Sequence, residues 1–324
     1  MPQNDYTYAV ARIRFKETQL LSDSDLYQLL SQRDVDTCIR FLHDKGWGDN
    51  SKTETVDELL KSEDNKTWKF IDEIIQEDKE ILDFFKIPSD FHNLKVAVKS
   101  ITRDIDAEDM FLYSGTVDPK LIYECVNKRE YERLPEHLYN VADKAMKTIL
   151  QTSDGQLCDM VIDKACLNCI SEIGKNADNE IIKLYCELYV ASADIKIAVR
   201  CAKTKKDISF ISRSLAFCDT LNIDRLASCA SFGFDSIVEY LSQTEYKSAV
   251  SAIETSISAF EKWCDDYLID ILASQKWEPF TIGPIIAYII ARNNEIKAVR
   301  MILFGKINAL DDDIIKKRLR KMYV

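Results

Sequence analysis

Three short stretches of the chain repeat at an even spacing, and this repeat limits the possible folds more than any other feature. They are Asn93-Leu94-Lys95, Asp194-Ile195-Lys196 and Glu295-Ile296-Lys297, and their middle residues are 101 positions apart in both intervals. In each copy, apolar residues recur at the middle position and three and seven positions later, which is the spacing of one face of a helix. The repeat predicts a helical unit of about a hundred residues that occurs three times.

A second echo supports the repeat but is less regular. Residues 30–35, 126–131 and 241–246 share an order of apolar, polar, acidic and apolar residues. Their uneven spacing indicates that the loops between the copies differ in length. A polar-aliphatic-lysine tripeptide also occurs by chance, and the sequence alone leaves that alternative open.

The composition favours long helices. The 324 residues include only 8 glycines and 6 prolines, about a third of the usual share of each. The apolar fraction of 46% and the charged fraction of 30% are ordinary for a soluble folded protein. Because strand alternation is also missing, the sequence predicts an all-α protein of three similar domains, over residues 1–112, 113–207 and 208–324.

Local signals mark the edges of these units. Residues 113–119 form the clearest boundary, where Asp118-Pro119 is a good helix opening, and the charged residues 203–207 end the second unit. Asp23, Ser24 and Asp34 are candidate helix caps near the N-terminus. Within the second unit we expect helices near residues 119–127, 135–150, 155–173 and 178–204.

The net charge of −11 argues against nucleic acid as a partner and against general adsorption to anionic lipid, because both would be approached against the field of the protein. The C-terminus is a local exception, with Lys316, Lys317, Arg318, Arg320 and Lys321 following Asp311–Asp313. One interpretation is a helix whose acidic start and basic end match its dipole. The other is a dedicated basic docking site.

The sequence contains no targeting or membrane-spanning signal. The first residues form neither a basic nor an apolar region, so no signal peptide is predicted. The longest apolar run, residues 280–291, is shorter than the roughly 20 residues that span a bilayer. We therefore expect a soluble, cytoplasmic chain whose ten cysteines are reduced and serve as small core residues.

Candidate chemistry is sparse. Cys166 and Cys169 have the spacing of a redox or zinc pair, but they lie in a helical pattern and lack a second ligand pair, which favours core cysteines. The histidines fall in no catalytic motif, and no glycine-rich phosphate loop is present. Asp265-Asp266 and Asp311–Asp313 are better explained as solvated faces and helix starts than as metal ligands. We predict no catalytic residue, cofactor or metal site.

Three landmarks nevertheless resemble a known family. They are YAVARIR from Tyr8 to Arg14, PSDFHNLK from Pro88 to Lys95, and GPIIAYIIARNNEIKAVRMILFGKINAL from Gly283 to Leu310, followed by the terminal RLRKMYV. In combination they are similar to the C-subunit family of V-type and A-type ATPases (ATP synthases), whose eukaryotic members are called the d subunit. The landmarks lie at both ends and in the first unit, so the resemblance covers essentially the whole chain.

The resemblance implies an all-helical fold of three domains arranged pseudo-threefold as a funnel around an opening. It also implies a non-catalytic rotor subunit, a socket that joins the axle of the ATP-hydrolysing head to the proteolipid ring and transmits torque for proton or sodium transport. The implied partners are the central axle subunits and the ring, with one copy per complex, no nucleic acid and no direct membrane span. The implied place is the cytoplasmic face of the membrane, where the complex holds the chain peripherally.

The matching positions share either a structural or an interface role in this interpretation, with Glu295 or Lys297 expected in ion pairs that hold helices together. They are Tyr8, Arg12, Asn93, Lys95, Pro284, Ala287, Tyr288, Glu295, Ile296, Arg300, Gly305, Lys306, Arg318, Leu319, Arg320 and Tyr323. The chain departs from the family pattern at Pro284-Ile285-Ile286, where Glu and Pro are frequent, and at Ser89, where tyrosine is frequent. These departures leave the local turn and its contacts open.

Two other classes of function compete with this interpretation. A helical-repeat adaptor for soluble proteins would have a concave binding groove and no association with membranes. An enzyme that uses Cys166 and Cys169 would lose its activity when either cysteine is replaced by serine.

Overall fold

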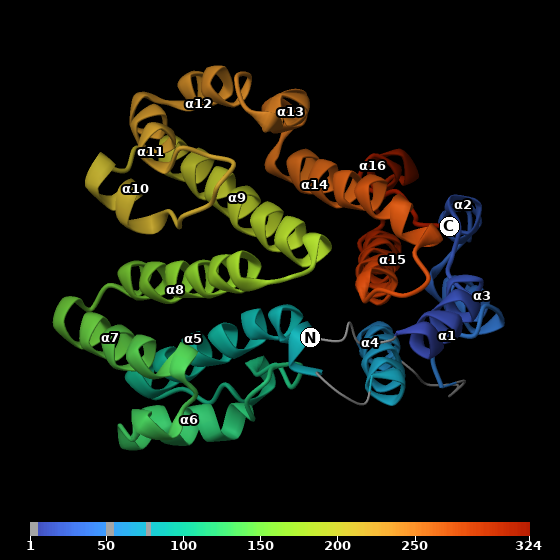
Figure 1. Cartoon of the computed structure of the whole chain (residues 1–324), viewed down its shortest axis with the longest axis horizontal. Helices are drawn as coiled ribbons and strands as arrows, with labels where there is room; N and C mark the ends of the chain where they lie inside the picture. The colour runs from blue at the N-terminus through green and yellow to red at the C-terminus, as the bar shows by residue number, and fades with distance from the viewer. Residues whose placement is uncertain (1–5, 50–54, 76–78) are drawn as a thin grey trace. The chain divides into compact units, whose positions relative to one another are not determined.

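The structure, a computed structural model, describes residues 6–49, 55–75 and 79–324. Every regular element in these residues is a helix, as the composition predicts. The α-helices are α1 Thr7–Glu17, α2 Asp23–Leu30, α3 Val35–Asp44, α4 Val56–Ile74, α5 Ile87–Arg103, α6 Pro119–Lys128, α7 Glu136–Thr152, α8 Gly155–Asn176, α9 Glu180–Lys203, α10 Ile208–Ser214, α11 Ile223–Phe232, α12 Phe234–Leu241, α13 Val250–Thr255, α14 Ile257–Leu272, α15 Gly283–Ile307 and α16 Asp312–Lys316 (Figure 1).

Short 3-10 helices join several of the α-helices. They are η1 Lys79–Phe85, η2 Glu108–Met110, η3 Tyr131–Arg133, η4 Glu245–Ala249 and η5 Ala273–Trp277. No helix in the described part of the chain combines the length and the apolar character that a membrane span requires.

The chain divides into two compact units. Unit 1 contains residues 1–79 and 251–324, and unit 2 contains residues 80–250. The division into three successive domains stays a prediction, which these two units do not test; the expected boundaries after residues 112 and 207 both fall inside unit 2.

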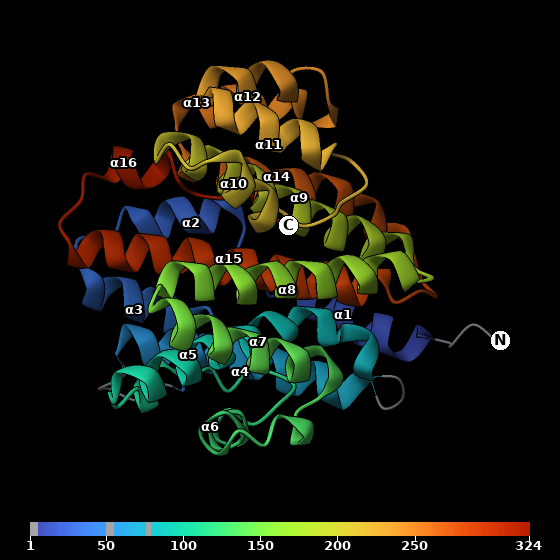
Figure 2. The same cartoon turned by 90° about the vertical axis from the view of Figure 1, so that its left-hand side faces the viewer.

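Unit 1 is built around α15. This helix packs against α1, α2, α3, α4, α14 and α16, and Figure 2 shows it running lengthwise with α2 above it and α3 below. Apolar residues occur on most sides of α15, and the helix is buried along most of its length except for a narrow polar strip with Lys297 and Arg300. Its C-terminal half shares one apolar core with α2, α3, the start of α4, and Leu319 and Met322 of the terminal segment.

Unit 2 contains α5 and α9, the helices that carry the first and second repeated stretches. Helix α5 packs against α6, α7 and α8, and α9 packs against α8, α10, α11 and α12. The helices expected near residues 119–127, 135–150, 155–173 and 178–204 correspond to α6, α7, α8 and α9.

Local signals were interpreted correctly at some positions and wrongly at others. Asp118 caps α6 through the N–H of Lys120, and Asp34 caps α3, both as predicted. The cap of α2 is Ser22, which forms a capping box with Asp25, because Asp23 and Ser24 already lie in the first turn. The residues around Gly283-Pro284 open α15 instead of forming a separate turn, since proline is favoured in the first helical turn.

The three repeated stretches lie on α5, α9 and α15, which we name the three long helices although α4, α7 and α8 reach similar lengths. Each helix closes with a backbone bond from an N–H to the carbonyl five residues earlier, the pattern of a Schellman-type end. The bonds run from Ile105 to Ser100 (3.1 Å), from Lys206 to Cys201 (3.0 Å) and from Leu310 to Gly305 (2.9 Å). The first two bonds are offset by the same 101 residues as the repeat, which supports a true structural repeat over chance.

Candidate functional site

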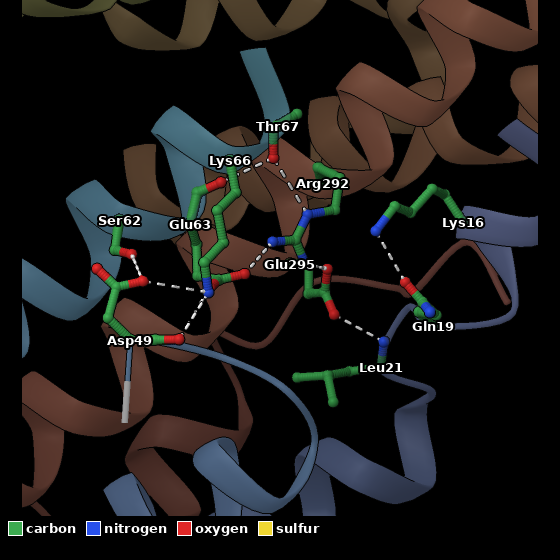
Figure 3. Close-up of polar contacts among 11 residues, drawn as sticks. Lys16, Gln19, Leu21, Asp49, Ser62, Glu63, Lys66, Thr67, Arg292 and Glu295 are labelled. Atoms are coloured by element: carbon green, nitrogen blue, oxygen red, sulfur yellow. Dashed lines mark hydrogen bonds and ion pairs between the residues drawn. The ribbon is translucent and has the colours of Figure 1, made fainter. Parts of the chain in front are cut away.

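A buried ionic network holds α15 in unit 1. Arg292 forms ion pairs with Glu295, one turn further along α15, and with Glu63 of α4 (Figure 3). The distance from Arg292 Nη2 to Glu63 Oε2 is 2.6 Å. Its Nε also donates to the hydroxyl of Thr67 at 3.3 Å. All three charged side chains are at least nine-tenths buried, so the network lies inside the fold and is not part of an accessible pocket.

The carboxylates extend the network to two backbone segments. Glu295 Oε1 accepts the N–H of Leu21, which precedes α2, at 2.7 Å. Glu63 Oε1 accepts hydrogen bonds from the Gly48 N–H at 2.9 Å and from Lys66 Nζ at 2.8 Å. The network therefore ties α15 to α4 and to the loops before α2 and α4 (Figure 3).

The charges in this network compensate one another. Burial raises the pKa of Glu295, while the Arg292 guanidinium and the Leu21 N–H oppose that rise. Burial also works against the charge of Arg292, but Glu295, Tyr288 and Glu63 outweigh it, so the pKa of Arg292 is raised. Two buried carboxylates facing one arginine, with half-exposed Lys66 on the rim, suit a structural tie and provide no free group for catalysis.

The first residue of each repeated stretch accepts a hydrogen bond from the backbone of another segment. Asn93 Oδ1 accepts the N–H of Leu112 at 2.8 Å, and its Nδ2 donates to the Leu112 carbonyl at 2.7 Å. Asp194 Oδ1 accepts the N–H of Ala216 at 3.0 Å. Together with the bond from Leu21 to Glu295, each long helix thus fixes a separate backbone segment through one fully buried polar side chain.

Asp194 differs from the other two because it is a carboxyl that forms no direct ion pair within the described residues. Its Oδ2 is buried without a hydrogen-bond partner there. Burial raises the pKa of Asp194 to about 7, and the Ala216 N–H and the more distant Lys164 only partly offset this effect. Asn93, by contrast, is neutral, and Glu295 is paired with Arg292.

The basic C-terminal cluster binds its own chain in part. Arg320 Nε lies 3.0 Å from Asp265 Oδ2, and Lys321 pairs with Asp270 of α14. Lys316 lies in the last turn of α16, as the dipole interpretation expects, with its ammonium 5.1 Å from the Tyr27 ring centre. Lys317 and Arg318 are exposed, and Lys317 lines a surface cavity of about 650 Å³ that carries both signs of charge.

Asp265 and Asp266 are partly exposed but do not lie at a helix start, which corrects that part of the interpretation from the sequence. They lie in the middle of α14. Asp265 pairs with Lys297 at 2.9 Å as well as with Arg320, and Asp266 accepts the Lys321 N–H at 2.7 Å. The expectation that Glu295 or Lys297 forms an ion pair that holds helices together is met by Lys297, which pairs with Asp265 of α14, whereas Glu295 pairs with Arg292 within α15.

Most of the resemblance positions are buried. The buried ones are Asn93, Pro284, Ala287, Tyr288, Glu295, Ile296, Gly305, Leu319, Arg320 and Tyr323. Gly305 has a clear steric reason, because a Cβ there would meet Ile315 Cδ1 at 2.5 Å. Except for Asn93, all of them belong to unit 1, where α15 and the terminal segment pack.

The remaining resemblance positions reach the surface. Tyr8, Arg12, Arg300 and Arg318 are exposed, whereas Lys95 and Lys306 are half-buried and pair with Asp163 at 2.6 Å and Asp312 at 2.8 Å. Arg12 donates to the Tyr8 hydroxyl at 2.8 Å and lies 5.5 Å from the Phe70 ring centre. Their roles as structural or interface residues stay predictions.

Seven of the ten cysteines are buried, and Cys169, Cys229 and Cys264 are partly buried. Burial raises the pKa of Cys166 to about 12 and that of Cys169 to about 11, so neither thiol is activated as a nucleophile. No group of three potential metal-ligating side chains gathers within the described ranges.

The sequence analysis missed Arg292, Glu63 and Thr67. Arg292 lies inside the apolar run of α15, and an arginine surrounded by apolar residues on a buried helix was the available signal that a carboxylate must lie opposite. The identity of that carboxylate could not be read, because Glu63 is 229 residues away in the chain.

Comparison with known proteins adds a whole-chain similarity. Residues 9–318 match the sequence model described as ATP synthase (C/AC39) subunit. The chain is 19% identical over 318 residues to the V-type sodium ATPase C subunit of Enterococcus hirae, covering 96% of this chain and 97% of that protein.

Two archaeal proteins are similar over comparable lengths. The A-type ATP synthase C subunit of Methanocaldococcus jannaschii is 22% identical over 348 residues, with 97% of this chain and 86% of that protein covered. The A-type ATP synthase C subunit of Methanosarcina mazei is 24% identical over 349 residues, with 98% and 93% covered.

Proposed function

The chain belongs to the ATP synthase (C/AC39) subunit family, and from this premise we propose that it is the coupling subunit of a rotary ATPase. Membership makes it a structural, non-catalytic subunit of a V-type or A-type complex. In the proposed role it is a socket that holds the axle of the ATP-hydrolysing head on the proteolipid ring and transmits torque for proton or sodium transport. It would lie peripherally on the cytoplasmic face of the membrane, as one copy per complex.

The observation that carries this proposal is the match over residues 9–318, together with relatives of nearly the same length. A match of this extent includes both units, so the chain has room for the whole subunit and not only for a shared module. A pseudo-threefold funnel of three domains, over residues 1–112, 113–207 and 208–324, remains part of the proposal.

The mechanical demand on such a subunit fits the way its long helices are held. Each elementary charge that crosses the membrane contributes about 2.3 kcal/mol per 100 mV, so a body that deforms easily would lose work as strain. Each long helix is fixed to another backbone segment by a buried polar side chain, Asn93, Asp194 or Glu295. We expect interfaces of more than about 1,000 Å² with both the axle and the ring, since weaker contacts would slip.

The first test is purification of the N-terminally tagged protein from native membranes, followed by mass spectrometry. Recovery of the head, the axle subunits and the ring proteolipid would support the coupling role. Recovery of soluble partners alone would contradict it and favour a helical adaptor.

A second test measures coupling directly. The complex is reconstituted into vesicles with and without this subunit, and ATP hydrolysis and ion uptake are recorded together. Without the subunit we expect the head to hydrolyse ATP while ion uptake is lost. Ion uptake that persists without the subunit would refute the proposed role.

A further inference from the structure

The basic C-terminal cluster borders a cavity that the proposed function does not use. The cavity has a volume of about 650 Å³ and is lined by α2, α14, α16 and the terminal segment, all of which belong to unit 1. Cavities of this size hold small molecules. It is therefore a candidate small-molecule site that is complete within one unit.

The charged side chains that line the cavity are mostly basic. Among the described residues, five are cationic and two are acidic, an excess of three positive charges in a chain whose net charge is −11. The cations are Lys262, Lys316, Lys317, Arg320 and Lys321, and the acids are Asp23 and Asp313. A cavity lined mostly by one sign of charge raises the local concentration of the opposite ion. The cavity should therefore attract anions although the chain as a whole is acidic.

Arg320 is held in place with part of its guanidinium left over. Its side chain is more than nine-tenths buried, and its Nε lies 3.0 Å from Asp265 Oδ2. Its Nη1 donates to the Arg318 carbonyl at 2.8 Å, whereas Nη2 forms no hydrogen bond within the described residues. Because Asp265 also pairs with Lys297, it compensates the charge of Arg320 only in part. Nη2 is thus a preorganised donor for an anion.

Two of the lysines pair with carboxylates that lie outside the lining of the cavity. Lys262 Nζ lies 2.5 Å from Asp266 Oδ2, and Lys321 pairs with Asp270. Both aspartates belong to α14 and do not line the cavity. An ammonium group has three donors, so one ion pair orients each lysine and leaves donors for a ligand.

Lys316 and Lys317 form no ion pair in the part of the chain that the structure describes. The dipole of α16, a helix of five residues, accounts for Lys316 in its last turn. It does not account for Lys262 of α14 or for Arg320 of the terminal segment, which line the same cavity. The convergence of cations from three elements favours the docking-site interpretation of the basic cluster.

We propose that this cavity binds a small anion that carries at least two phosphate groups. Phosphate accepts charge-assisted hydrogen bonds from arginine and lysine, and two phosphate groups carry roughly three to four negative charges at neutral pH, which matches the excess of three positive charges in the lining. A free polyphosphate and a phosphorylated lipid headgroup share this chemistry. The inference does not depend on the rotary role of the subunit.

The test measures binding of inorganic tripolyphosphate to the complete purified chain by calorimetry. The variants are Lys316→Gln, Lys317→Gln and the two combined, since both side chains are exposed and their replacement leaves the core intact. The matched control combines Lys61→Gln and Lys69→Gln, which remove the same charge from exposed positions of α4 outside the cavity. Circular dichroism and thermal unfolding check that every variant folds like the wild type.

Each single substitution should weaken tripolyphosphate binding about fivefold, and the combined variant about tenfold or more. The control should bind like the wild type. Asp313→Asn removes a carboxylate from the lining and should strengthen binding about twofold to threefold. Sulfate at the same ionic strength should bind more weakly, because it carries fewer charges.

A second readout locates the ligand. Acetylation of lysines, followed by mass spectrometry, should show that tripolyphosphate protects Lys316 and Lys317 and leaves Lys61 and Lys69 unprotected. A third measures sedimentation of the chain with phosphatidylcholine vesicles, with and without phosphatidylinositol bisphosphate. Binding of tripolyphosphate would support a free ligand, and binding of the bisphosphate vesicles alone, lost in the combined variant, would support a lipid headgroup.

Four results would overturn the inference. They are binding of neither probe by the wild type, unchanged binding by the folded combined variant, equal weakening in the Lys61 and Lys69 control, and sulfate binding as tight as that of tripolyphosphate. None of them bears on the proposed function, because recovery of the chain with the ATPase complex is measured separately.

Discussion

One position of the repeat uses three different chemistries for the same task. Asn93, Asp194 and Glu295 all fix a backbone N–H from inside a helix. The Asn93 amide is neutral and needs no countercharge, and the Glu295 carboxylate is paired with Arg292. The Asp194 carboxyl can ionise but has no such partner. A buried carboxyl without a cation keeps its proton to higher pH, because burial penalises the charged form.

Asp194 should therefore make stability depend on pH. Its pKa is raised to about 7 in the folded state, so between pH 4 and 7 the folded protein binds a proton that the unfolded chain has released. The free energy of unfolding should fall as the pH rises through this window, by a few kcal/mol in total. In Asp194→Asn this fall should be absent, and the variant should be more stable than the wild type above pH 7.

The measurement is urea unfolding from pH 4 to pH 8. The reverse change at the equivalent position, Asn93→Asp, should add a decline with pH and also lose the bond to the Leu112 carbonyl. Parallel profiles for the wild type and Asp194→Asn would contradict this account of Asp194.

The Arg292 network should respond strongly when only one partner is removed. Arg292→Met leaves Glu295 buried without a countercharge and Glu63 with only the half-exposed Lys66, and we expect a loss of about 3–5 kcal/mol in the free energy of unfolding. Adding Glu63→Gln and Glu295→Gln should recover part of this loss. The control is Lys297→Met, which breaks a half-exposed ion pair with Asp265 and should cost about 1 kcal/mol or less. Similar losses for Arg292→Met and Lys297→Met in chemical denaturation would contradict the buried network.

At the scale of elements, the three long helices end in left-handed residues that are not glycine. Asp104, Lys205 and Ala309 have φ values of 51°, 53° and 50°. Alanine has no side-chain bond to compensate for this conformation, whereas aspartate tolerates it better. The helix ends therefore carry some backbone strain, which lowers stability.

Ala309→Gly should stabilise the protein by about 0.5–1 kcal/mol, because glycine adopts positive φ without the steric penalty. Asp104→Gly should gain less. The control Ala298→Gly lies inside α15 and should destabilise by about 1 kcal/mol. Thermal unfolding of the three variants tests this prediction. If Ala309→Gly lowered the stability, the prediction that the positive φ of Ala309 is strained would be contradicted.

At the scale of the whole molecule, the last residues of the chain complete a unit that the first residues begin. Lys276 donates to the Tyr323 carbonyl at 2.5 Å, and the N–H of Met322 bonds to Asp23 at 3.2 Å. Leu319, Met322 and Tyr323 are buried. The terminal segment is therefore part of the unit 1 core and not a free tail.

Deletion of residues 317–324 should weaken unit 1 selectively. It removes three buried apolar side chains, each worth about 1.5–3 kcal/mol when buried, together with the ion pairs to α14. Hydrogen exchange followed by mass spectrometry should show lost protection in α2, α3 and α15 and unchanged protection in α5 to α9. Equal loss in both units would mean that the two units do not unfold independently.

The sequence by itself determined the helices, the repeated stretches and several caps. These features depend on the spacing of apolar residues and on side chains within four positions of one another, such as Asp34 with Thr37 and Asp118 with Lys120. The resemblance landmarks in addition identified the family.

Only the tertiary structure decided which distant segments meet. Helices α1 to α4 pack with α15, Arg292 pairs with Glu63 on α4, and Arg320 and Lys297 pair with Asp265 on α14. The pattern of a helix shows which face is buried but not which face of another helix covers it. Many apolar faces are interchangeable by that measure, so the choice among them depends on the packing of the complete chain.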